Sequence, residues 1–273
     1  MDYGPPGLYR LAHRVDPSTT VDLVLAVESA EGLTEAAASW LEQPHRTWNV
    51  VLAAPDTILD SAVAALTAAG LPRQRITTLP VAPGDPAGAL AAAADTATAE
   101  QLVLMQAPAI GLTHDWLTRI IGYAGQPGIA AAGPIVLTPD GRIHHAGIAI
   151  PDGIPLHLLH GTRALGALGV VFNFSAISGM LATRRDTFCA LGGLNAHYKS
   201  LALIDYCLRA TTTHQRIVIV PDARLRTTGP DTTTNDLPTI WQLRTTWAQT
   251  HTHDPYYNPN YRTDRGDFQH VRS

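Results

Sequence analysis

Charged residues are scarce in this chain of 273 residues. Asp, Glu, Lys and Arg together make up 15% of it, against about 25% in a typical soluble domain. Lys199 is the sole lysine, and the arginines are spread along the chain without forming a basic stripe. The net charge of -4 also disfavours a nucleic-acid-binding surface. We therefore expect no nucleic-acid partner.

Cysteines and long apolar runs are also few. Cys189 and Cys207 both stand in apolar segments, a pattern that favours reduced, buried thiols over a disulfide framework. No run reaches the roughly 18 apolar residues of a membrane span. Residues 1–14 carry Pro and Arg where a signal peptide needs an apolar core. The sequence thus predicts a cytoplasmic protein without a transmembrane segment.

The hydrophobic fraction of 45% is sufficient for a large core. From residue 21, short aliphatic runs alternate with amphipathic ones, which is typical of strands alternating with helices. The predicted strands are residues 21–27, 50–53, 76–79 and 102–105, and the predicted helices are residues 34–43, 57–69 and 86–100. This pattern predicts an α/β fold with a Rossmann-like, mostly parallel sheet and helices on both faces. In such sheets a nucleotide binds beyond the carboxyl ends of strands, here the loops after Val27, Ala53 and Met105.

The second half mixes strands and helices less regularly. A helix is expected over residues 113–123 with Thr113 as N-cap, and the Pro-Asp-Gly turn at 139–141 predicts a hairpin of two strands. The hairpin strands are residues 129–137 and 143–150, followed by an apolar run at 176–182, a short helix from Arg184, a helix at 201–211, a strand at 217–220 and a helix at 237–251. Residues 254–260 are too rich in Pro and Asn for regular structure, so we expect an ordered tail that wraps the domain. We interpret 1–273 as one domain, with a nucleotide-binding half at 21–110, an acceptor-side half at 111–253 and the tail at 254–273.

Five motifs occur in the order found in one known family. Residues 139–147, PDGRIHHAG, resemble the PDGRIQHAG hairpin of family 2 glycosyltransferases. Further matches are the SGM, RR, F and GGLN elements within 178–195, DYCLR at 205–209, VPDARL at 220–225, and DPYYNPN at 254–260, the last typical of rhamnosyltransferase-like members. The resemblance implies a GT-A fold in which one half binds a nucleotide diphosphate sugar and the other faces a glycan acceptor. The implied reaction is inverting transfer of a hexose to a glycan hydroxyl.

The chain departs from this family where the family's donor-side chemistry resides. Glu28 lies in the turn where the family has Pro-x-Tyr-Asn, and Asp56 is the acidic residue that remains after the second strand. The Asp-x-Asp motif that holds a divalent cation is replaced by Gln-Ala-Pro at 106–108. One neutral oxygen is a poor substitute for two carboxylates, so we expect neither Mg²⁺ nor Mn²⁺ to bind as a cofactor.

The residues that the family uses for catalysis are also altered. Leu203 aligns with the catalytic base, leaving Asp205 as a weak substitute two residues further on, and Thr227 aligns with a His that helps hold the cation. The candidate nucleotide-sugar-binding residues are Glu28, Asp56, Gln106 and Arg142, and the candidate acceptor-side residues are His145, His157, Ser178, Gly179 and Arg185. Close histidine pairs, such as His144 and His145, are expected to be structural, because a zinc site usually adds Cys or a carboxylate and neither cysteine lies near these pairs in sequence.

Two functions remain open. The first is a non-catalytic or weakly nucleotide-binding GT-A domain that supports a partner glycosyltransferase in glycan or polysaccharide synthesis. The second is a metal-independent transferase in which an arginine or a helix N-terminus neutralises the leaving diphosphate. The candidate arginines are Arg142, Arg184, Arg185 and Arg226. A working enzyme requires a new carboxylate or His near Leu203 and a cationic group near Gln106.

Overall fold

The first half of the chain folds as the alternating pattern predicts, although the helix expected at 86–100 ends at Thr96, because Ala97 takes an extended conformation. The computed structural model describes residues 11–163, 166, 169–228, 236–247, 254–264, 266–269 and 271. Its first elements are β1 (Val21–Ala26), α1 (Leu33–Leu41), β2 (Trp48–Pro55), α2 (Asp56–Ala68), η1 (Arg73–Arg75), β3 (Ile76–Val81), α3 (Pro86–Thr96) and β4 (Gln101–Met105). β1 pairs in parallel with β2 and β4, and β2 pairs in parallel with β3. β1 and β4 are buried along their whole length, as expected where helices cover both faces of a parallel sheet.

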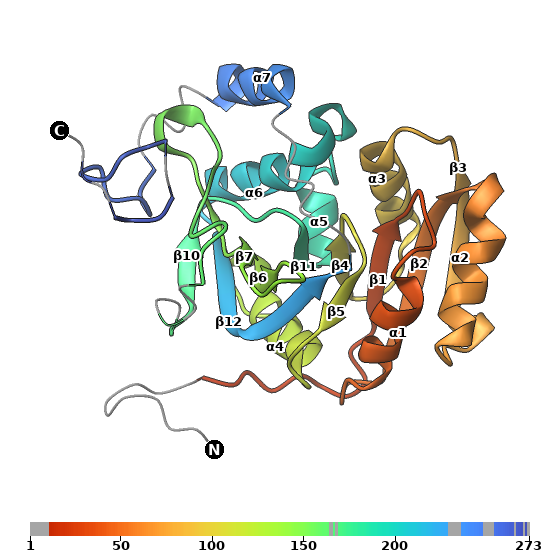
Figure 1. Ribbon diagram of the computed structural model, residues 1–273. Coiled ribbons are helices and arrows are strands. Elements are labelled where there is room, and N and C mark those ends of the chain that lie inside the picture. The colour runs from red at the N-terminus through yellow and green to blue at the C-terminus, as the bar shows by residue number, and fades with distance from the viewer. Residues whose placement is uncertain are drawn as a thin grey trace.

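The second half extends the same sheet. Its elements are β5 (Ala109–Gly111), α4 (Trp116–Ala124), β6 (Ile129–Leu137), β7 (Ile143–His145), β8 (Ile148–Ala149), η2 (Pro151–Gly153), β9 (Leu156–His157), β10 (Phe172–Phe174), β11 (Met180–Arg184), α5 (Arg185–Ala190), η4 (Ala196–Leu201), α6 (Ala202–Thr212), β12 (Arg216–Thr227) and α7 (Leu237–Trp247). The strand order is β10-β12-β6-β11-β4-β1-β2-β3, with β5 beside β12 and β7 beside β6 (Figure 1). Each antiparallel pair recorded includes β5 or a later strand. The predicted α/β fold with a mostly parallel sheet is confirmed.

Helices cover the two faces of the sheet and close two separate cores. Successive residues of β1 alternate between them, with Val24 in one core and Leu23 and Leu25 in the other. Helices α3, α5, α6 and α7 contribute to the first core, and α1, α2 and α4 to the second. This alternation follows from the period of two in a strand.

Several predicted boundaries shift for identifiable reasons. The helix expected from 113 begins at Trp116, because the Thr113 hydroxyl accepts a hydrogen bond from the Arg224 N–H instead of capping the helix. The strand expected at 143–150 is interrupted near Gly147, which has φ 109 and packs against the Phe174 ring. The strand expected at 217–220 continues to Thr227, because it passes an irregularity and pairs with β5 and β6.

Three further expectations meet mixed outcomes. The helix expected to end at residue 251 is described only as far as Trp247, and residues 248–253 lie outside the described part. Cys207 is buried, but Cys189 is exposed, so the prediction of two buried thiols is wrong for Cys189; both are free thiols. Cys189 stands at the end of the short helix α5, where only one side of the helix meets the core.

Within the described residues, no helix has the length and apolarity needed to cross a membrane.

The described tail residues pack against the body of the protein. The buried Asp254 carboxylate accepts hydrogen bonds from the Ile150 N–H and, at 2.7 Å, from the Ser175 hydroxyl. The Leu159 N–H donates to the Gly266 carbonyl at 2.8 Å. These contacts place the tail beside the loop that contains β8 and β9.

Candidate functional site

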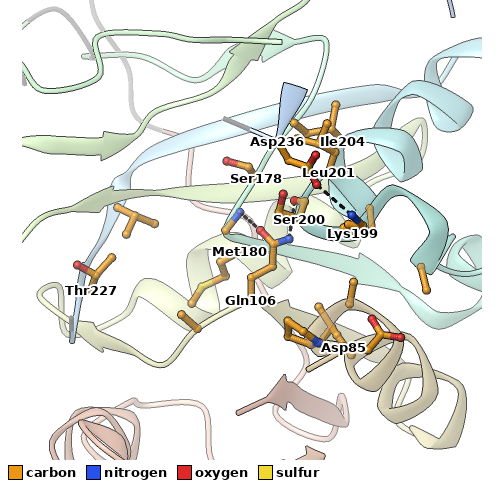
Figure 2. A pocket seen from close by; sticks show the side chains of 18 of the residues that line it. Asp85, Gln106, Ser178, Met180, Lys199, Ser200, Leu201, Ile204, Thr227 and Asp236 are labelled. Atoms are coloured by element: carbon orange, nitrogen blue, oxygen red, sulfur yellow. Dashed lines mark hydrogen bonds and ion pairs between the residues drawn. The ribbon is translucent and has the colours of Figure 1, made fainter. Parts of the chain in front are cut away.

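A cavity of about 990 Å³ lies beside the carboxyl end of β4, on the side of the loop after Met105. Segments that are far apart in sequence line it: residues 84–87 at the start of α3, residues 106–109 after β4, residues 178–180 at the start of β11, and the segment that leads into α6. Single residues complete the lining: Leu90, Val136, His144, His157, Thr227 and Asp236. Figure 2 shows these side chains around the cavity. Of the three loops expected to hold a nucleotide, only the one after Met105 lines this cavity.

Gln106 ties three of these segments together. Its N–H donates to the Gly179 carbonyl at 2.8 Å, and its Oε1 accepts the Gly179 N–H at 2.9 Å. Its Nε2 donates to the Ser200 carbonyl at 2.8 Å (Figure 2). Both ends of the amide are therefore used in bracing the wall. The side chain that replaces the family's cation-binding motif acts here as a structural link.

The other predicted donor-side residues lie outside the cavity wall. Glu28 accepts a hydrogen bond from the Gly84 N–H at 2.6 Å, so it holds a loop that lines the cavity. Asp56 borders a separate pocket of about 490 Å³. Arg142 pairs with Asp140 at 2.9 Å and remains half exposed in the hairpin. The cavity thus brings together only Gln106 from this group.

The acceptor-side candidates divide between the cavity wall and its support. Ser178, Gly179 and His157 line the cavity. His145 is buried outside the wall, with its Nδ1 3.2 Å from the Ser178 hydroxyl. Burial holds the pKa of His145 well below its ordinary value. Repulsion from the neighbouring His157, His144 and His160 lowers this pKa further. His145 is therefore a neutral ring that positions Ser178. Arg185 lies elsewhere, where its Nε donates to the Ala97 carbonyl at 2.9 Å.

The residues around the family's base position face inward. Leu203 is completely buried in the core, whereas its neighbours Ala202 and Ile204 line the cavity. Asp205 is buried and pairs with Arg209 at 2.9 Å, and it accepts a hydrogen bond from the Trp247 indole at 3.2 Å. These partners tie α6 to α7. Asp205 does not line the cavity, so its position fits a structural role.

Three charged residues that line the cavity were missed as site residues: Asp85, Lys199 and Asp236. Asp85 caps α3, where its Oδ1 accepts the Gly88 N–H at 2.9 Å. Lys199 Nζ lies 3.3 Å from Asp236 Oδ2, and both residues line the cavity (Figure 2). Hydrogen bonds from the Thr239 hydroxyl and N–H lower the pKa of Asp236, so its carboxylate is ionised. The uniqueness of Lys199 in the composition was a usable signal. Asp236 offered only the weak pattern of an acidic residue three positions before a threonine at a helix start.

Histidines and carboxylates do not form a metal site in the described part of the chain. His145 and His157 have ring centroids 6.1 Å apart, and those of His157 and His160 are 5.9 Å apart. No group of three or more His, Cys, Asp or Glu side chains among the described residues is placed to hold a metal ion. The donor set at Gln106 likewise does not fit a hard divalent cation.

Comparison with known proteins identifies few sequence relatives. No protein-family model matches the chain. An uncharacterized protein, y4gI, of Sinorhizobium fredii (strain NBRC 101917 / NGR234) is 30% identical over 175 residues. The match covers 58% of this chain and 19% of the relative. The chain thus corresponds to about a fifth of that protein's length.

Solved structures reveal a clearer similarity. The mannosyltransferase PcManGT of Pyrobaculum calidifontis, solved with GDP-Man and Mn²⁺, matches with a TM-score of 0.56 and 17% identity, covering 89% of this chain and 66% of that one. GalNAc-T7 with UDP, GalNAc and Mn²⁺ matches with a TM-score of 0.61 and 14% identity, covering 84% of this chain and 48% of that one. S. aureus TarS 1–349 matches with a TM-score of 0.56 and 14% identity, covering 84% and 65%. The chain therefore spans about half to two thirds of these structures.

These neighbours define the class of the fold. The chain has the GT-A-like glycosyltransferase fold that its motifs implied. The cavity of about 990 Å³ lies within this fold at the carboxyl end of β4.

Proposed function

We propose that this chain is a GT-A domain that binds a nucleotide sugar without carrying out conventional metal-dependent transfer, and that it supports a partner glycosyltransferase in glycan or polysaccharide synthesis. Its donor would occupy the cavity beside Gln106. In this proposal the family 2 scaffold is kept and its standard catalytic groups are not.

The observation that carries the proposal is the use of Gln106 as a brace. Where the family places two carboxylates on a cation, this chain places one amide whose oxygen and nitrogen bond to Gly179 and Ser200. Leu203, at the position of the base, is buried and cannot accept a proton. Metal coordination and general-base catalysis are thus both without their usual residues.

The proposed partner role is supported by the length of the Sinorhizobium fredii relative. The Sinorhizobium relative is matched over 19% of its length, so a domain of this kind occurs there within a much longer chain. A supporting domain that acts beside another domain is consistent with such an arrangement.

A second candidate function is a metal-independent transferase. The Lys199 and Asp236 pair favours it, because a carboxylate in the cavity could accept the acceptor's proton and an ammonium could offset charge on the leaving diphosphate. In that case Asp236 would take the role that Leu203 cannot fill.

A donor-turnover assay separates the two candidates. The purified chain is incubated with UDP-, GDP- and dTDP-sugars and an oligosaccharide mixture, in EDTA or in Mn²⁺, and the released nucleoside diphosphate is quantified. The proposal predicts no release above a heat-denatured sample in either buffer. Release in EDTA that is lost in Asp236→Asn would instead establish the metal-independent transferase, and release only in Mn²⁺ would contradict both candidates.

A further inference from the structure

Lys199 is the cation of the cavity. It is the sole lysine in the chain, and no arginine accompanies it among the described residues that line the cavity. The arginines considered as counter-charges are engaged elsewhere: Arg142 with Asp140, Arg184 with Asp186, Arg185 with the Ala97 carbonyl, and Arg226 with Glu35. A ligand with negative charge therefore meets one permanent cation among the described lining residues, beside the carboxyl groups of Asp236 and Asp85.

The backbone brings Lys199 close to the Gln106 position. The next residue, Ser200, accepts the Gln106 amide through its carbonyl. Lys199 itself adopts φ 46 and ψ -124, which is the conformation of position i+1 in a type II′ turn. This position favours glycine, and a residue with a Cβ is strained there. The backbone of the sole lysine thus lies one residue from the contact of Gln106, the position where the family resemblance puts a divalent cation.

Asp236 is a counter-ion that Lys199 can leave. The pair is 3.3 Å apart, and the Lys199 side chain is 66% exposed. An ion pair this exposed contributes little stability. Asp236 is held independently by Thr239, whose N–H and hydroxyl both donate to its carboxylate, at 3.3 and 2.7 Å. Lys199 can thus change partners while Asp236 stays in place.

We propose that Lys199 binds the diphosphate group of a nucleotide sugar in place of a divalent cation, and that Asp236 is the counter-ion it exchanges for the phosphate. An ammonium carries three donors and no acceptor, which suits phosphate oxygens. The inference rests on the proposed function for the presence of a nucleotide sugar, and it adds the residue and the group recognised. It also predicts that Asp236 competes with the ligand.

Charge variants test this exchange by isothermal titration calorimetry. UDP, GDP and dTDP are each titrated into the full chain in EDTA. For the nucleotide that binds, we expect Lys199→Gln to weaken binding by at least about tenfold, as loss of a charge-assisted hydrogen bond implies. Asp236→Asn, which keeps a side chain able to cap α7, should strengthen binding by removing the competing carboxylate. Arg226→Gln removes a cation outside the cavity and should leave the affinity unchanged.

Lysine labelling gives a second readout that needs no variant. An N-hydroxysuccinimide acetate reagent acetylates Lys199 and the amino terminus, and peptide mass spectrometry separates the two. The binding nucleoside diphosphate should slow acetylation of Lys199 and not of the amino terminus, whereas the matching nucleoside should not slow it.

Two outcomes would overturn the inference and leave the proposed function standing: equal affinity in the wild type and Lys199→Gln, or protection of Lys199 by neutral oligosaccharides alone. Absence of binding by all three nucleotides would contradict both. Donor turnover, which the release assay measures separately, would contradict the proposed function and leave the role of Lys199 standing.

Discussion

Lys199 has a backbone conformation that is unfavourable for a residue with a side chain. Its φ of 46 and ψ of -124 are stable for glycine and strained for a residue with a Cβ. The ion pair with Asp236 does not offset much of this strain, because the Lys199 side chain is largely exposed. The strain therefore makes a prediction about stability that is independent of any ligand.

Glycine at position 199 should be more stable than alanine. Both Lys199→Gly and Lys199→Ala remove the ammonium, but only glycine relieves the turn, so we expect Lys199→Gly to exceed Lys199→Ala by about 1 kcal/mol in free energy of unfolding. Urea denaturation of the two variants measures the difference. Equal stability, or a more stable alanine variant, would show that the turn is not strained.

His145 makes stability depend on pH. Burial and the neighbouring histidines lower its pKa in the folded state, while the unfolded chain binds the proton near pH 6.5. The unfolded state then holds more protons below that pH, so stability is complete above about pH 6.5 and falls by up to about 1.4 kcal/mol per pH unit as the pH decreases further.

The matched variant for this effect is His145→Asn, with the exposed His114→Asn as control. Urea denaturation at several values between pH 5 and 7.5 should give a shallower slope for His145→Asn than for the wild type, and an unchanged slope for His114→Asn. Identical slopes in all three proteins would contradict the buried neutral histidine.

At the scale of elements, a helix or strand could be predicted when its own sequence pattern defined it, and not when contacts with distant residues did. The strands and helices of the first half follow from aliphatic runs and amphipathic spacing, because parallel strands are buried on both faces. The length of β12 could not be predicted, since its extension to Thr227 depends on pairing with β5 and β6 far away in sequence. Likewise, the break at Gly147 depends on the Phe174 ring.

The brace at Gln106 is an element-scale device, because it joins β4, the turn before β11 and the segment before α6. Gln106→Ala should lower the free energy of unfolding by about 1–2 kcal/mol, since Gly179 N–H and Ser200 C=O lose their partner. Gln126→Ala, which removes a single bond to the Gly122 carbonyl within one helical turn, should cost about 0.5 kcal/mol or less. Equal losses in urea denaturation would argue against a brace.

At the scale of the whole molecule, motifs predicted the fold better than the site. Five ordered motifs pointed to a GT-A fold, which the structural neighbours confirm. The cavity includes Gln106, Ser178, Gly179 and His157, but it excludes Glu28, Asp56 and Arg142. Lys199 and Asp236 belong to no motif. Apart from the uniqueness of Lys199 in the composition, they became visible only when the fold brought residues 199 and 236 together.

The central claim is that the domain binds a nucleotide sugar without a divalent cation. Calorimetric titration of the wild type with UDP-, GDP- and dTDP-sugars, each in EDTA and in Mn²⁺, tests it most directly. The account predicts that at least one of them binds, with a Kd that is the same within about twofold in the two buffers. Binding that appears only in Mn²⁺, or no binding in either buffer, would contradict it.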